Sequence, residues 1–182
     1  MTDTTMQARM AGLELQLKRF EAEKSVRACV VRYMDLCDRL TADSPLDELA
    51  ALFTKEAVWE GVGARYAGSF GGYRGRDQIA TMFRGYMKDP PHFALNVHFL
   101  CSELIDVNAD ATGALASWVM LQTSTFATGH SHLNAARLTL KMAVEEGAWR
   151  IAHFQTENLF SRPVDKWNDA APLPVPDQPS KD

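Results

Sequence analysis

Residues 136–142, ARLTLKM, alternate apolar and polar side chains, with Leu138 and Leu140 on one parity and Arg137 and Lys141 on the other. A period of two is typical of a strand that buries one face. The same period extends over four long segments, and turn-forming residues separate them. These segments are residues 92–107, 111–126, 131–145 and 148–160. The sequence therefore predicts a meander of long antiparallel strands.

Upstream of these segments the periodicity is helical. Residues 13–40 carry apolar side chains at spacings of three and four, which predicts one helix, or two if Ser25 caps a second segment. Ser44 before Pro45 marks a further helix start, and a third helix is predicted from about Asp77 to Met87. Helices followed by long strands predict an α+β fold, with helices packed on one face of a curved sheet.

Length and composition indicate a single domain over residues 1–182. The folded core is predicted at about 20–160, with an N-terminal tail at 1–12 and a proline-rich tail at 168–182. The net charge of −4 and the absence of a basic stripe argue against nucleic acid and anionic membrane surfaces as partners. Three cysteines without a CxxC pair suggest reduced thiols in a cytoplasmic protein, and no spacing of histidines and carboxylates predicts a metal site.

Four short motifs resemble segments of the nuclear transport factor two superfamily, in its SnoaL-like and scytalone-dehydratase-like branch. They are RYMDLCDR at 32–39, ALFTKEAVW at 51–59, GRDQI at 75–79 and GAWRI at 147–151. The resemblance implies a cone-shaped, curved antiparallel sheet wrapped around three N-terminal helices. Members of this superfamily include dehydratases, isomerases, cyclases, dehalogenating lyases and subunits without chemistry, so the fold does not name the reaction.

The same resemblance implies a catalytic group built from the first helix and the first long strand. Tyr33 and Asp38 would face a pocket, and a histidine paired with the aspartate would act as the base. On an ideal helix Tyr33 and Asp38 point about 140° apart, so Asp38 reaches the pocket only if the helix bends or ends there. His98 is the preferred partner of Asp38, and His92 is the alternative because a bulge would reverse the parity. The competing interpretations are that Tyr33 is a core residue and that Asp38 forms a surface ion pair with Arg39.

Further side chains are predicted to form the walls of the pocket. Aromatic and amide side chains there would bind a flat apolar substrate with hydroxyl or carbonyl groups, although such residues also occur in ordinary cores. These candidates are Trp59, Phe83, Asn96, Trp118, Gln122 and Asn134. The glycine-rich segment 61–75 is expected to form either a mobile flap or a structural hairpin. His130 and His132 are expected at the surface, and the sequence shows no partner for His153.

These features predict a lyase that needs no cofactor and removes water or another small molecule by acid–base chemistry. Its substrate would be a hydrophobic, oxygenated aromatic, polyketide or steroid-like molecule. The alternatives are an isomerase or cyclase that uses the same pocket, and a non-catalytic binding protein or dioxygenase-small-subunit-like protein. The resemblance further implies a homo-oligomer, either a dimer or a trimer.

Overall fold

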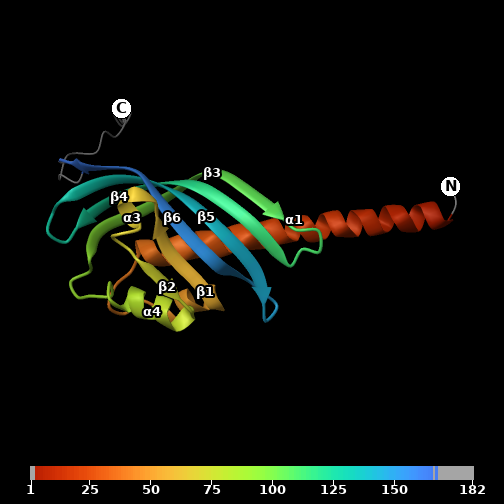
Figure 1. The fold of residues 1–182 in the computed structure, drawn as a ribbon, viewed down its shortest axis with the longest axis horizontal. Coiled ribbons are helices and arrows are strands. Elements are labelled where there is room, and N and C mark those ends of the chain that lie inside the picture. Colours follow the sequence, from red (N-terminus) through yellow and green to blue (C-terminus); the bar gives the residue numbers. More distant parts are fainter. Residues whose placement is uncertain (1–2, 166, 168–182) are drawn as a thin grey trace, which may run out of the picture.

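A computed structural model of the chain describes residues 3–165 and 167. The elements follow one another as a long helix, a mixed region of short helices and strands, and a meander of four long strands (Figure 1). They are α1 Asp3–Asp38, α2 Leu46–Ala51, β1 Phe53–Val62, α3 Gly63–Tyr66, β2 Gly72–Arg74, α4 Arg76–Arg84, β3 Phe93–Val107, β4 Gly113–Phe126, β5 Ser131–Glu145 and β6 Ala148–Val164.

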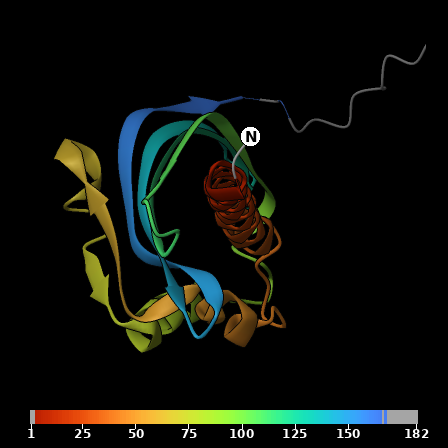
Figure 2. The ribbon, with the colours of Figure 1, turned by 90° about the vertical axis from the view of Figure 1, so that its right-hand side faces the viewer.

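The six strands form one curved sheet in the order β2-β1-β6-β5-β4-β3. The prediction of a wholly antiparallel sheet was wrong, because β1 pairs with β6 in parallel, with Trp59 opposite Phe154. All other pairs are antiparallel, and the four long strands lie close to their predicted positions. Figure 2 shows the sheet curving around α1, so the concave face and one face of the helix share a core.

Helix α1 is continuous, and it packs its C-terminal half against the concave face of the sheet. Val26, Val30 and Tyr33 are buried there at helical spacing. Ser25 does not start a second segment, because its hydroxyl donates to the carbonyl of Glu21 within the same helix. Residues 3–12, expected to be a tail, belong to α1.

The expectation of three N-terminal helices was also wrong, because only α1 and α4 are substantial. Helix α2 has six residues and α3 has four. Ser44 does not cap α2, since its hydroxyl accepts the Thr41 N–H at 2.8 Å and contacts the Arg39 carbonyl. Within the described residues, no helix has both the length and the apolar character needed to cross a membrane.

Strand β3 changes the face that its side chains present. Asn96 and His98 point into the concave side, whereas Leu104 is exposed and Val107 is buried. The pairing with β4 is interrupted between Cys101 and Leu104, and Ser102 has a φ of 51°. One extra residue reverses the parity of a strand, so polar positions line the cavity before the bulge and apolar ones join the core after it.

Candidate active site

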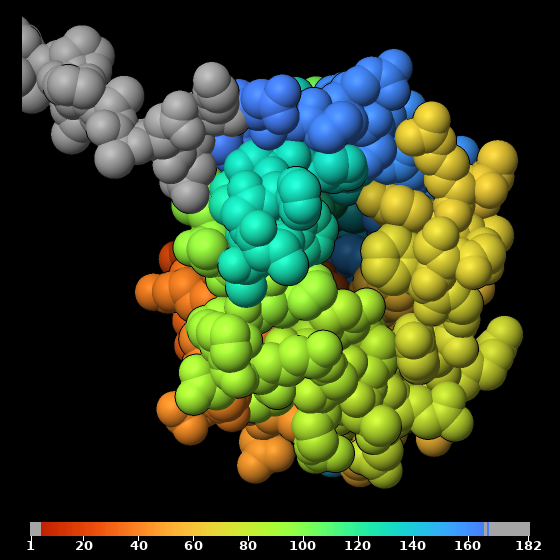
Figure 3. Space-filling model, turned by 90° about the vertical axis from the view of Figure 1, so that its left-hand side faces the viewer, coloured from red at the N-terminus to blue at the C-terminus, as the bar shows by residue number. Residues whose placement is uncertain are grey.

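A cavity of about 440 Å³ lies between α1, α4 and the concave face of the sheet. Figure 3 shows the molecule hollowed at the end away from the N-terminus, between α3, the β4–β5 turn and the segment that leads into β3. Aromatic side chains form much of its wall, among them Trp59, Phe83 and Phe154. The size and the apolar lining are those of a site for a small organic molecule.

Asp38 and His98 form a hydrogen-bonded pair at the wall of this cavity. Asp38 is the last residue of α1, so the end of the helix allows its carboxylate to turn toward β3. Its Oδ1 lies 2.5 Å from Nδ1 of His98, and both carboxylate oxygens accept the backbone N–H of His98 at 3.1 Å. The side chains are 20% and 11% exposed, and the histidine ring lines the cavity. Asp38 therefore holds the ring through Nδ1, and Nε2 is the ring nitrogen that Asp38 does not contact.

Tyr33 lies on the buried face of α1 and also lines the cavity. Its hydroxyl accepts a hydrogen bond from Nε1 of Trp59 at 3.0 Å, and its ring packs edge-on against Phe53 and Phe83. Burial of the ring and the neighbouring Cys37 thiol raise the pKa of Tyr33 well above its ordinary value. The phenol therefore stays protonated over the physiological pH range and can donate a hydrogen bond.

Amide side chains form a connected polar strip along the strands. Gln122 donates to the side-chain oxygen of Asn96 at 2.8 Å, and Asn134 donates to Gln122 at 3.3 Å. Asn134 also donates to the hydroxyl of Tyr66 at 2.8 Å, and Ser124 donates to Asn96 at 2.9 Å. All five residues line the cavity, so this strip supplies hydrogen-bonding groups on an otherwise apolar wall.

Two other histidines, His92 and His132, also line the cavity. His92 lines the cavity but packs edge-on against Tyr86 and Phe126, and its contacts do not include Asp38. His132, expected at the surface, also lines the cavity and lies 3.1 Å from the Ser161 hydroxyl. The expectation failed because β5 already begins at Ser131.

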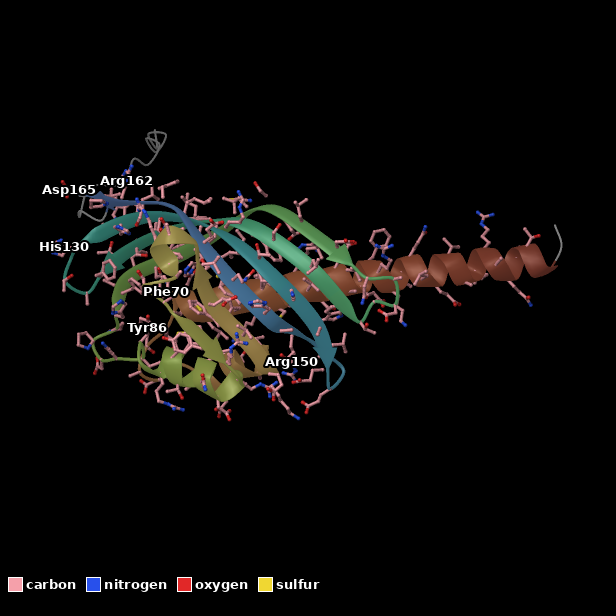
Figure 4. The ribbon with its side chains drawn as sticks, viewed as in Figure 1. Phe70, Tyr86, His130, Arg150, Arg162 and Asp165 are labelled. Carbon is pink, nitrogen blue, oxygen red and sulfur yellow. The ribbon has the colours of Figure 1, made fainter. Side chains whose placement is uncertain are left out.

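His130 is exposed, as expected. Figure 4 shows it at the tip of the β4–β5 turn. His153 has a partner that sequence spacing could not reveal, because β1 and β6 are far apart in the chain. Its Nε2 lies 2.8 Å from Glu60 Oε1, and Gln155 donates to the same oxygen at 2.8 Å. The hydrogen bonds from Gln155 and His153 lower the pKa of Glu60. This second histidine–carboxylate pair is not part of the cavity wall.

Of the six predicted wall residues, five line the cavity and Trp118 does not. Trp59, Phe83, Asn96, Gln122 and Asn134 are in the wall. Trp118 is buried beside the cavity instead, and its indole N–H donates to Glu103 at 3.3 Å.

The glycine-rich segment contributes Tyr66 and Phe70 to the wall, whereas Tyr73 packs on Trp59. Tyr86, from the segment after α4, completes the rim with Phe70, and Figure 4 labels both at this end of the molecule. Tyr86 was missed because nothing in its local sequence separates a rim aromatic from a surface one. Within the part of the chain that the structure describes, no cluster of three or more metal-ligating side chains occurs.

Comparison with solved structures shows the same fold in several proteins of low sequence identity. A hexachlorocyclohexane dehydrochlorinase, LinA-type3, from Novosphingobium barchaimii LL02 is 15% identical with a TM-score of 0.69, over 86% of this chain and 99% of that chain. A scytalone dehydratase-like protein from Novosphingobium aromaticivorans DSM 12444 is 17% identical with a TM-score of 0.68, over 82% and 91%.

An NTF2-like protein with a cystatin-like fold, from Novosphingobium aromaticivorans, is 19% identical with a TM-score of 0.63, over 82% of this chain and 89% of that chain. No curated protein sequence matches the chain. The sequence profile of the SnoaL-like domain matches residues 18–155, which include α1 from its middle onward and most of the sheet. The chain therefore belongs to the SnoaL-like domain family and has the NTF2-like fold.

Proposed function

We propose that the protein is a cofactor-independent lyase that removes water or another small molecule from a hydrophobic, oxygenated substrate. The observation that carries this proposal is the Asp38–His98 pair on the wall of a largely aromatic cavity. A positioned imidazole beside a carboxylate is a common arrangement for proton abstraction. Two proteins of similar fold are named as a dehydrochlorinase and as scytalone dehydratase-like, and both names refer to eliminations.

His98 would act as the base because of how Asp38 holds it. An ionised carboxylate can only accept hydrogen bonds, so Nδ1 of His98 carries the proton and Nε2 keeps its lone pair. When Nε2 takes a proton from the substrate, the charge that forms on the ring is stabilised by Asp38 at 2.5 Å. The cavity wall excludes much of the water that would compete for this proton.

The elimination balances without any further reactant. Nε2 of His98 removes a proton from one substrate carbon, and the electron pair of that C–H bond forms the new double bond. The bond from the adjacent carbon to the leaving oxygen breaks, and this oxygen keeps the bonding pair. The proton on His98 then passes to the leaving oxygen, so that water departs and the neutral imidazole is restored. Tyr33, held protonated, hydrogen-bonds a substrate oxygen while this occurs.

The substrate class follows from the wall of the cavity. Flat aromatic side chains such as Trp59 and Phe83 favour an aromatic, polyketide or steroid-like skeleton. The amide strip would bind its hydroxyl or carbonyl groups, because buried amides need partners when water is displaced. We also propose a homo-oligomer, a dimer or a trimer, since the outer face of β3 and β4 exposes Leu95, Phe99 and Leu115.

An isomerase or cyclase in which an aspartate alone moves the proton is the second candidate. Among the described residues that line the cavity there is no aspartate or glutamate, and Asp38 acts on the cavity through His98. The lyase therefore agrees better with the geometry. A pH–rate profile separates the two, because an imidazole base gives an acidic limb near about pH 6–7 and a carboxylate base a lower one.

The proposal is tested by turnover of a panel of aromatic and polycyclic β-hydroxy ketones, with loss of water followed by mass spectrometry. We expect His98→Gln to lower kcat by about 10²- to 10⁴-fold, the usual contribution of a general base. His153→Gln is the matched control, because His153 also pairs with a carboxylate but lies outside the cavity wall. Full turnover by His98→Gln would contradict the mechanism. Binding without turnover by the wild type would favour the non-catalytic binding protein.

A further inference from the structure

Helix α1 carries a second apolar stripe outside the core. Met6, Met10, Leu13, Leu17 and Phe20 follow one another at spacings of four, three, four and three, and are 47–65% exposed. This is the spacing of a coiled-coil seam, in which apolar side chains recur on average every 3.5 residues. We call these five residues the α1 seam.

The α1 seam faces away from the sheet. Among the side chains of α1 that the structure describes, from residue 5 onward, the first buried one is Ala22, followed by Val26, and these two face the sheet. Phe20 and Ala22 are two positions apart, which places them about 160° apart around the helix axis. The helix therefore has two apolar stripes on opposite sides, and the sheet covers only the one in its C-terminal half.

The segment that carries the seam projects from the fold. Residues 5–21 are all exposed and extend for about 25 Å at the usual helical rise. Figure 1 shows most of this part of α1 extending past the sheet, while Arg19 near its end donates to the Val107 carbonyl of β3 at 3.1 Å. The family profile begins only at residue 18. An isolated helix of this length is marginal in water, so a row of large apolar side chains along it indicates a partner helix.

We propose that the α1 seam binds the same seam of a second copy of this chain, as a parallel two-stranded coiled coil. With Met10 and Leu17 at position a, Arg9 is at position g and Glu14 is at position e. In a parallel pair each g residue faces the e residue five positions later on the other helix. Arg9 of each copy would then meet Glu14 of the other, which gives two opposite-charge pairs related by the twofold axis.

The sequence and the fold both favour the parallel arrangement. An antiparallel pair that kept Phe20 in the seam would place the two Glu14 side chains opposite each other, which is unfavourable. In the parallel pair each sheet lies on the side of its own helix away from the axis, so the folds do not collide. Lys24 occupies the next a position, and its repulsion from its own copy would end the seam after Phe20.

Sedimentation equilibrium tests the interface directly. At a concentration between the two Kd values, we expect the average mass of Leu17→Glu to fall toward half that of the wild type, because the substitution raises the Kd at least about tenfold by placing two carboxylates in the seam. Leu15→Glu is the matched control, since Leu15 is 45% exposed on the same segment but not in the seam, and it should keep the wild-type mass. If the sheet face also associates, Leu17→Glu should keep that interface and still have a lower mass than the wild type. Equal masses for the wild type and Leu17→Glu would overturn the proposal.

A cysteine at position 13 tests the parallel register. In a Cys101→Ser background, which removes the exposed native thiol, Leu13→Cys should form a disulfide-linked dimer under mild oxidation, because equivalent d positions meet only in a parallel pair. Leu15→Cys should remain largely unlinked. No linkage at position 13, or equal linkage at 13 and 15, would overturn the parallel coiled coil. These outcomes are independent of turnover, so they do not depend on the proposed lyase.

Discussion

At the scale of single residues, burial decides what the side chains around the cavity can do. Burial raises the pKa of Cys29 to about 11 and that of Cys37 to about 12. Cys37 lines the cavity, yet at neutral pH it is a thiol and not a thiolate nucleophile. The same desolvation keeps Tyr33 protonated. His98, which Asp38 holds in place, is therefore better suited than the Cys37 thiol or the Tyr33 phenol to take a proton.

This difference between thiols is testable by alkylation. At pH 8 only about a thousandth of Cys29, and less of Cys37, would be thiolate, whereas Cys101 is exposed. We expect iodoacetamide to modify Cys101 rapidly and to leave the other two unmodified in the folded protein, as measured by peptide mass spectrometry. Denatured protein is the control, in which all three should react alike. Rapid labelling of Cys37 in the folded state would contradict the buried position of this thiol.

Some of these residues could be proposed from the sequence and others could not. The positions of Tyr33, Asp38 and His98 followed from motif resemblance and helix geometry, and the structure brings Asp38 to His98 because α1 ends at that residue. Trp118 shares the strand and the parity of Gln122, yet its neighbour Glu103 holds it beside the cavity. Such placement depends on contacts between distant strands, which a single sequence does not contain.

At the scale of elements, the bulge in β3 joins the strand to α1. It turns Glu103 toward the helix, where its two oxygens accept from Arg27 Nε at 3.0 and 2.9 Å. The same carboxylate accepts from the Trp118 indole. Arg27 is the main cause of the lowered pKa of Glu103. This ion pair fixes α1 to the strand that carries His98, one bulge away from the candidate base.

The pH dependence of this ion pair has a definite sign. Because the folded-state pKa of Glu103 is lowered, its stabilisation is fully present above the unfolded carboxyl pKa of about 4.3 and is lost as pH falls through the folded value. We expect Glu103→Gln to lower the free energy of unfolding by about 0.5–1 kcal/mol at pH 7, discounted for partial exposure. At pH 3 the difference should shrink, as measured by urea unfolding.

Glu56→Gln is the control for this prediction, because Glu56 is exposed on β1 and lies outside this cluster. It should leave the free energy of unfolding nearly unchanged at both pH values. A Glu103→Gln effect that grows as the pH is lowered would contradict the ionic origin of the stabilisation.

Some of these elements could be predicted from the sequence and others could not. Four long strands could be predicted because stretches of each alternate with a period of two, and their ends agree with the turn signals, whereas the bulges that interrupt this alternation could not be predicted. The parallel pairing of β1 with β6 could not, because it joins residues about 95 positions apart. The start of the seam could not be predicted from the expected tail at residues 1–12, and its apolar face lies opposite the buried face of the helix.

At the scale of the whole molecule, the two halves of α1 have different roles. The C-terminal half of α1 completes the core and delivers Tyr33 and Asp38 to the cavity. The N-terminal half presents the α1 seam at the opposite end. Association through the seam would therefore leave the cavity mouth open, and the substrate could enter without any change in the assembly.

The hydrogen bond between Asp38 and His98 is the contact on which the proposed mechanism depends. It joins the end of α1 to β3, between residues that are 60 positions apart in the sequence. Its direct test is the tautomer of His98, measured by long-range ¹H–¹⁵N NMR of histidine-labelled protein at about pH 8.5, where imidazoles are ordinarily neutral. The imidazole signals are assigned with two variants: His153→Gln removes the signals of His153, and Asp38→Asn should change those of His98. We predict that Nδ1 of His98 carries the proton and Nε2 does not, which leaves Nε2 free as the base. Protonation at Nε2, or a His98 signal unaffected by Asp38→Asn, would contradict this.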